Sequence, residues 1–237
     1  MVSPSLMRLA APLAAVTALL AACGGAATPA SATGTPTAAA TTSTPTPIAT
    51  ASATTITTGT WTVSNTSKAT VRVREQLVGV NLPSDAVLVA TGATGAFVLN
   101  DDGTFASDSK ITFDVTTLAS DQHNRDDFVK MDTLQARQFP TATFVPAKTS
   151  GLALPLPTSG DFTFKLTGQM TIHGKTKEVT FDVVAHRSGN ELTATATASP
   201  TWKFSDFGMT APSVPFRVVS IVDEIRLVVD LVATVKA

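Results

Sequence analysis

The sequence predicts an all-β domain of antiparallel strands, closed into a barrel or packed as a sandwich, with one short helical excursion. Three observations lead to this prediction. Apolar and polar residues alternate along many short segments, turn-forming residues separate those segments, and only one stretch has helical spacing. Alternation gives each strand one dry and one wet face, and a sheet of this kind removes its exposed edges by closing on itself.

The N-terminal fifth of the chain does not belong to this domain. Residues 1–22 carry one basic residue, Arg8, followed by an apolar run that is short for a membrane span and ends in small residues. The run at 20–23, LAAC, resembles the lipobox of bacterial lipoproteins, and Cys23 is the only cysteine in the chain. The alternative is an ordinary signal peptide with an incidental cysteine. We expect an exported protein, anchored to the outer face of a bacterial membrane through acylated Cys23.

A tether follows the expected lipidation site. Residues 23–58 consist almost entirely of Ala, Thr, Ser, Pro and Gly, and no charged residue occurs from 9 to 67. Such a segment lacks the large apolar side chains that offset ordering entropy, and its X-Pro steps favour extended conformations. We therefore expect a disordered spacer, and a folded domain over 59–237, which is near the usual size of one domain.

Composition restricts the partners of the domain. The chain has 17 basic and 18 acidic residues, with no basic run and no tyrosine. Nucleic-acid binding needs a basic surface, usually with aromatic side chains on which bases stack. The sequence therefore predicts no nucleic-acid partner.

The strands can be placed in order by their alternation. Clear apolar faces with period two occur at 69–73, 111–115, 162–166, 179–183 and 225–235. Turn signals lie between such segments, at 100–103 (NDDG), at 173–174 (HG) and at 188–190 (SGN).

One segment breaks the β pattern. Residues 121–139 place Phe128, Met131 and Leu134 at helical spacing, and Pro140 follows. We expect a short helix or two helical turns here, covering part of the sheet.

The stretch 168–176, GQMTIHGKT, superficially resembles a phosphate-binding loop. That motif needs four residues between its first glycine and Gly-Lys, whereas five separate Gly168 from Gly174. The intervening residues alternate as a strand does, and a β-rich segment follows where the motif requires a helix. We interpret the stretch as a strand ending in a hairpin, in which Gly174 supplies a positive φ.

Six motifs in order resemble those of the YceI-like family, secreted or periplasmic bacterial proteins that enclose a polyisoprenoid chain. They are GTWTV at 59–63, DQHNRDDF at 121–128, QFPTATF at 138–144, LTGQMTIHGKTKEV at 166–179, SDFGM at 205–209 and VDEI at 222–225. The resemblance implies an antiparallel up-and-down, lipocalin-like eight-stranded β-barrel. It also implies an exported isoprenoid carrier, buffer or scavenger that binds a quinone or polyprenyl chain, with no catalysis and no cofactor besides this ligand.

An apolar lumen is the expected binding site, and the inward faces of the strands identify its lining. The set contains no charged side chain and so suits a hydrocarbon tail. Packing of these side chains into a plugged barrel, which acts as an interaction module, is the alternative. The expected lining residues are Val71, Val73, Phe97, Phe113, Phe162, Phe164, Leu166, Met170, Ile172, Phe181, Val183, Trp202, Phe204 and Leu227.

Polar residues near the mouth are candidates to bind the ligand's head group. Arg74, His123 and Arg125 are the expected donors to a quinone carbonyl or a phosphate. The cluster from Asp121 to Asp127 also permits a second hypothesis, an exported metal-dependent enzyme, although capping and ion pairing at a helix start are the favoured explanation of these residues. The expected partners are an isoprenoid lipid and, through the anchor, a membrane; homodimer formation is open.

Overall fold

The computed structural model describes residues 59–213 and 216–236. The predicted leader, the lipidation site Cys23 and the tether 23–58 lie outside the described residues. Ten strands form one sheet, in which every pairing is antiparallel. The strands are β1 (Trp61–Val63), β2 (Lys68–Leu77), β3 (Ser84–Ala90), β4 (Thr94–Phe97), β5 (Lys110–Asp114), β6 (Thr141–Ser150), β7 (Ser159–Ile172), β8 (Lys175–Ser188), β9 (Glu191–Ala198) and β10 (Val218–Val235).

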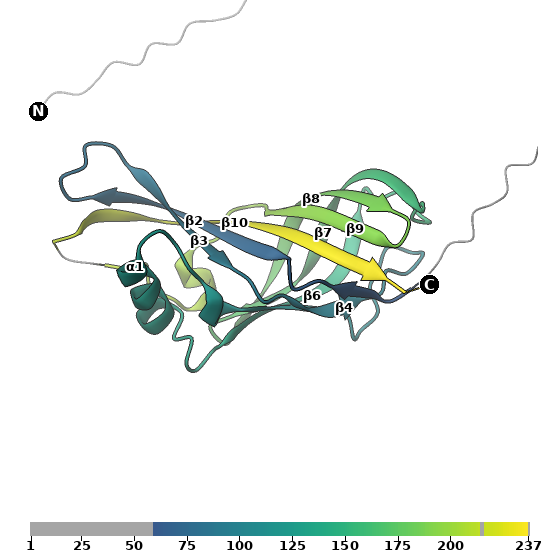
Figure 1. Ribbon diagram of the computed structural model, residues 1–237, viewed down its shortest axis with the longest axis horizontal. Coiled ribbons are helices and arrows are strands. Elements are labelled where there is room, and N and C mark those ends of the chain that lie inside the picture. Colours follow the sequence, from purple (N-terminus) through teal and green to yellow (C-terminus); the bar gives the residue numbers. More distant parts are fainter. Residues whose placement is uncertain (1–58, 214–215, 237) are drawn as a thin grey trace, which may run out of the picture. The chain divides into compact units, whose positions relative to one another are not determined.

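The sheet closes into a barrel. β1 pairs with β4 on one side and with the last residues of β10 on the other, which completes a ring of β1, β4, β5, β6, β7, β8, β9 and β10. β2 pairs with β10 from Val218 to Asp230, and β3 pairs with the other edge of β2, so these two strands extend the wall beside the ring. The predicted eight-stranded up-and-down barrel is confirmed, because neighbours around the ring follow the order of the chain once β2 and β3, which pair outside it, are left out. Figure 1 shows β2 beside β10 in this wall.

Short helical segments connect β5 to β6 and β9 to β10. They are η1 (Val115–Thr117), α1 (His123–Phe128), the π-helical turn η2 (Val129–Thr133) and η3 (Phe204–Phe207). The helical excursion predicted within 121–139 is thus present as α1 and η2. In residues 59–213 and 216–236, no helix is long and apolar enough to cross a membrane.

The longest hairpin contains the stretch that resembles a phosphate-binding loop. β7 and β8 have 14 residues each and pair from Ser159↔Ser188 to Ile172↔Lys175. His173 and Gly174 connect them with φ values of 51° and 70°. Positive φ at both central residues is the geometry of a type I′ hairpin turn, so the predicted role of Gly174 is confirmed.

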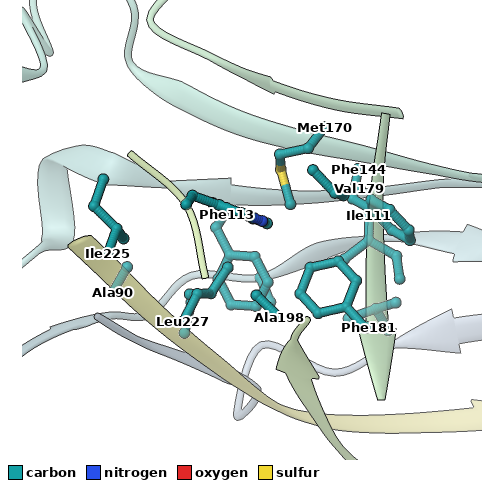
Figure 2. Close-up of a cluster of buried hydrophobic side chains, with 14 of the residues drawn as sticks. Ala90, Ile111, Phe113, Phe144, Met170, Val179, Phe181, Ala198, Ile225 and Leu227 are labelled. Atoms are coloured by element: carbon teal, nitrogen blue, oxygen red, sulfur yellow. The ribbon is translucent and has the colours of Figure 1, made fainter. Parts of the chain in front are cut away.

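Alternation along the strands builds the interior. On β8, Val179, Phe181, Val183 and Ala185 are buried, while Asp182 and Val184, which alternate with them, are exposed. Figure 2 shows how side chains from separate strands, among them Met170 of β7 and Phe181 of β8, turn into one shared interior. The inward side chains of the wall therefore determine whether the barrel is solid or hollow.

Candidate functional site

The barrel is hollow. It encloses a cavity of about 1020 Å³, which all ring strands line, mostly with apolar side chains. This volume is at the upper end of the range for ligand pockets. All fourteen residues predicted to line a lumen do line this cavity, so the side chains do not plug the barrel.

Small side chains on β9 make room for the cavity. The inward residues Ala194 and Ala196 line it, as do bulkier groups such as Phe164 and Leu166 of β7. Interiors are normally packed as densely as organic crystals, so a wall built from alanine leaves a void that neighbouring side chains do not fill. A molecule in the cavity would contact the methyl groups of Ala194 and Ala196 and the backbone of β9.

An aromatic cluster forms one wall of the cavity. Phe144, Phe181, Trp202 and Phe207 follow one another in edge-to-face contacts, with successive ring centroids 5.3, 5.9 and 5.2 Å apart. Phe207 is fully buried in η3, so this helical turn anchors Trp202 against the barrel. Such contacts fix ring orientations and give this wall a defined shape.

The mouth of the cavity carries a buried ion pair. Arg125 of α1 donates from Nη2 to Oε1 of Glu75 on β2 and from Nη1 to Oδ1 of Asp121, both at 2.7 Å. The Glu75 and Arg125 side chains are only 6% and 18% exposed, and all three residues line the cavity. The hydrogen bond from Arg125 holds the pKa of Asp121 below its ordinary value. The sequence predicted a lining without charged side chains, whereas the observed lining includes this ion pair.

The structure separates the three residues predicted to bind a head group. Arg125 lines the cavity, whereas Arg74 and His123 do not. Arg74 lies on the exposed face of β2 and donates to Asp85 at 3.2 Å. His123 is 86% exposed and lies 3.5 Å from Asp127 on the following helical turn. Only Arg125 is therefore placed to reach a ligand in the cavity.

The acidic residues of the 121–127 cluster act separately. Asp121 accepts from Arg125, while buried Asp126 accepts from the backbone N–H and the hydroxyl of Ser120 at 2.9 and 2.6 Å. Asp127 faces His123 in water. Within the ranges that the structure describes, no three His, Cys, Asp or Glu side chains are grouped to hold a metal ion.

The opposite end of the barrel is closed around Arg187. This arginine is 3% exposed, and its Nε donates to the carbonyl of Gly189 at 2.9 Å. Its Nη1 donates to the carbonyls of Leu156 and Pro157 at 3.3 and 3.1 Å, and its guanidinium lies 5.0 Å from the ring centroid of Trp61. Burial lowers the pKa of Arg187. The segment held by Arg187 forms the floor of the cavity, because Leu156 lines it.

Sequence reasoning missed both Glu75 and Arg187. Each continues the inward face of a strand: Glu75 follows Val71 and Val73 on β2, and Arg187 follows Val183 and Ala185 on β8. A charged residue in phase with an apolar face is the signal that identifies them.

Comparison with known proteins places the fold among described domains. Residues 48–233 match the sequence profile of the YceI-like domain; this match begins inside the predicted tether. Proteins of Pseudomonas putida strains F1 and KT2440, each called UPF0312 protein, are 32% identical over 124 residues, which cover 47% of this chain and 61% of theirs. The aligned part thus spans about three fifths of these relatives.

Two solved structures share the fold. A polyisoprenoid-binding domain from Saccharophagus degradans, implicated in plant cell wall breakdown, has a TM-score of 0.56 at 10% identity, covering 74% of this chain and 98% of that one. BcnA of Burkholderia cenocepacia has a TM-score of 0.51 at 22% identity, covering 71% and 96%. At these identities the likeness concerns the fold alone.

Proposed function

Because this chain belongs to the family of YceI-like domains, we propose that its barrel binds a polyisoprenoid, a quinone or polyprenyl chain, and acts as a carrier, buffer or scavenger without catalysing a reaction. The similar domain from Saccharophagus degradans is described as polyisoprenoid binding. The same class of ligand suits the cavity of this chain. An isoprenoid tail is long and apolar and has no hydrogen-bonding groups. Most of the side chains that line the cavity are apolar too.

The hollow, apolar interior is the observation on which the proposal rests. Each 100 Å² of tail surface removed from water contributes roughly 2.5 kcal/mol, and the ordering of a flexible tail offsets part of this. A polar ligand of the same size would leave its hydrogen-bonding groups unpaired against Phe, Leu and Ala side chains, at a cost of about 1–3 kcal/mol each. The cavity therefore selects for hydrocarbon.

Arg125 is the proposed contact for the head group. It lies at the mouth, and its two carboxylate partners differ in exposure: the Glu75 side chain is 6% exposed and that of Asp121 is 77% exposed. A carbonyl or phosphate oxygen would replace Asp121 at Nη1, because an exposed ion pair contributes little and is easily exchanged. Glu75 would keep the guanidinium in place from the buried side.

The proposed site of action is the outer face of a bacterial membrane. A leader over 1–22, acylation of Cys23 and a spacer over 23–58 would hold the barrel near a source of isoprenoid lipids. The sequence of the leader and the single cysteine support this part of the proposal.

Native mass spectrometry tests the proposal directly. The chain would carry Cys23→Ser, which removes the expected acylation site, and bound material would be extracted and its mass determined. Ala196→Phe fills the lumen from β9, whereas Thr197→Phe places the same ring on the outer face of that strand and is the matched control.

We expect an adduct of isoprenoid mass in the parent chain and in Thr197→Phe, and its loss in Ala196→Phe. A parent chain that stays free of adduct after incubation with quinones and polyprenyl phosphates would disprove the proposal. Retention of the adduct in Ala196→Phe would show that the ligand binds elsewhere.

A further inference from the structure

One rim of the cavity mouth exposes an unusual amount of apolar surface. We call this rim the lip and define it as residues 77–83, the end of β2 and the turn to β3, together with residues 216–222, where β10 begins. Six of the nine strongly exposed large hydrophobic side chains in the described part of the chain belong to it. These six are Val78, Val80, Leu82, Phe216, Val219 and Val222.

The two segments of the lip form one structural unit. Leu77 pairs with Val218, and the N–H of Val78 donates to the carbonyl of Arg217 at 3.0 Å. The side-chain amide of Gln76 also donates to the carbonyl of Val80, which fixes the turn. In Figure 1 the β2–β3 turn and the start of β10 project together beyond α1. The exposed side chains are therefore carried at one end of the barrel by paired backbone.

The apolar surface of the lip continues into the cavity. Val78, Val80 and Phe216 are exposed to solvent and also line the cavity, with exposed fractions of 53, 46 and 95%. A hydrocarbon tail can therefore move from the lip to the lumen along apolar side chains without crossing open water. Contiguous exposed patches of this kind mark sites of protein or membrane contact.

Charge distinguishes the lip from the opposite rim. Within 77–83 and 216–222 the only charged residue is Arg217, and no acidic residue occurs. On the opposite rim, α1 and the residues before it expose Asp121 and Asp127. An apolar edge with a basic residue suits the boundary between acyl chains and anionic head groups, whereas exposed carboxylates would be repelled there.

We propose that the lip docks on the surface of a lipid bilayer and inserts Leu82 and Phe216 into it. Docking would place the cavity mouth against the membrane on one side, while the acidic rim remains in water. A second copy of the chain seated on the lip would instead cover the mouth. The inference goes beyond the binding function proposed above, because it would hold for any apolar molecule taken from a membrane.

A local fluorescence reporter can test docking even if the N-terminal segment also reaches the membrane. The chain has one cysteine, so Cys23→Ser combined with Leu82→Cys gives a single labelling site for an environment-sensitive nitrobenzoxadiazole dye. Val184→Cys, on the exposed face of β8 and 61% exposed, is the matched control. The vesicles would contain phosphatidylethanolamine and phosphatidylglycerol.

We expect vesicles to shift the emission of the dye at position 82 to the blue and to raise its intensity at least threefold. The emission of the dye at position 184 should not change. Arg217→Glu should reduce apparent vesicle affinity at the Leu82 reporter at least threefold. No change at Leu82, or equal changes at both positions, would overturn the proposal. A shift at Leu82 that depends on protein concentration without vesicles would also overturn it, in favour of a second copy. Because the protein carries no added isoprenoid here, failure of isoprenoid binding in the mass experiment would leave this readout unaffected.

Discussion

At the scale of single residues, two charged side chains on inward faces mark the two ends of the cavity. Glu75 continues the inward face of β2 and meets Arg125 at the mouth, while Arg187 continues that of β8 at the floor. Burial of a charge is costly unless hydrogen bonds or an opposite charge compensate it. Glu75 has an ion partner, whereas Arg187 is compensated by backbone carbonyls and the face of Trp61. This difference leads to different predictions for the two sites.

Arg187→Met should lower the free energy of unfolding by about 2 kcal/mol, because the carbonyls of Leu156, Pro157 and Gly189 lose their donor. Arg187→Lys should recover only part of this, since an ammonium cannot reproduce the fork of a guanidinium. Urea unfolding measures both effects. Arg72→Met, on the exposed face of β2, is the control and should change little. Equal stability of Arg187→Met and the parent would show that the floor does not depend on this residue.

Arg125→Ala should weaken binding of isoprenoids with a polar head group at least tenfold, and should leave binding of tail-only analogues nearly unchanged. It should also reduce stability by about 3 kcal/mol, because Glu75 remains buried without its partner.

The paired variant Arg125→Gln with Glu75→Gln separates these two effects. It should recover stability, since no uncompensated charge remains, without recovering head-group binding. Titrations with headed and tail-only ligands, together with urea unfolding, provide the readouts. Equal loss of both ligand classes in Arg125→Ala would argue against a head-group contact.

At the scale of elements, strands with large side chains could be predicted and strands with small ones could not. Phe162, Phe164 and Leu166 identify β7 by alternation alone. By contrast, sequence reasoning assigns no strand to β9, Glu191–Ala198, because Ala alternating with Thr is a weak hydrophobic signal. β9 is placed by its hairpin with β8 and by its ladder with β10, and the second of these is a long-range contact. A strand whose small side chains leave room for the cavity thus has a weak local pattern.

The contact between β6 and β7 depends on a glycine inside a strand. A Cβ on Gly168 would lie 2.4 Å from the carbonyl oxygen of Val145 and 2.6 Å from the ring of Phe144. Gly168→Ala should therefore push the strands apart and reduce stability by about 2 kcal/mol. Gln169→Ala, the exposed neighbour on the same strand, should cost much less. Thermal unfolding of both variants measures the difference, and equal melting temperatures would disprove the close approach.

At the scale of the whole molecule, the interior was more predictable than the mouth. Burial follows the period of the strand, so each predicted lumen residue lies on the cavity wall. The mouth depends on the contact between α1 and β2. The two residues that make it, Arg125 and Glu75, are 50 positions apart in the sequence. Side-chain chemistry could not show which of Arg74, His123 and Arg125 turns inward, because all three can bind a head group.

The ion pairs that connect distant strands predict how the whole barrel responds to acid. Arg226 of β10 donates to Asp85 of β3 at 2.7 Å, and this bond, with a weaker one from Arg74, lowers the pKa of Asp85 from its ordinary 3.8. Hydrogen bonds from Lys177 and Lys165 likewise lower the pKa values of Asp206 and Asp182.

A carboxylate whose pKa is lower in the folded state stabilises the protein fully above its unfolded pKa, and this contribution is lost as the pH falls through the folded value. Stability to urea should therefore be nearly constant from pH 7 to about 4, near the ordinary pKa of Asp, and should fall below that. Asp85→Asn should be less stable than the parent at pH 7 and lose less on acidification, because it has no proton to take up. Urea unfolding at intervals from pH 7 to pH 2 measures both curves. Parallel curves for the two proteins would show that the link between β3 and β10 does not contribute to acid sensitivity.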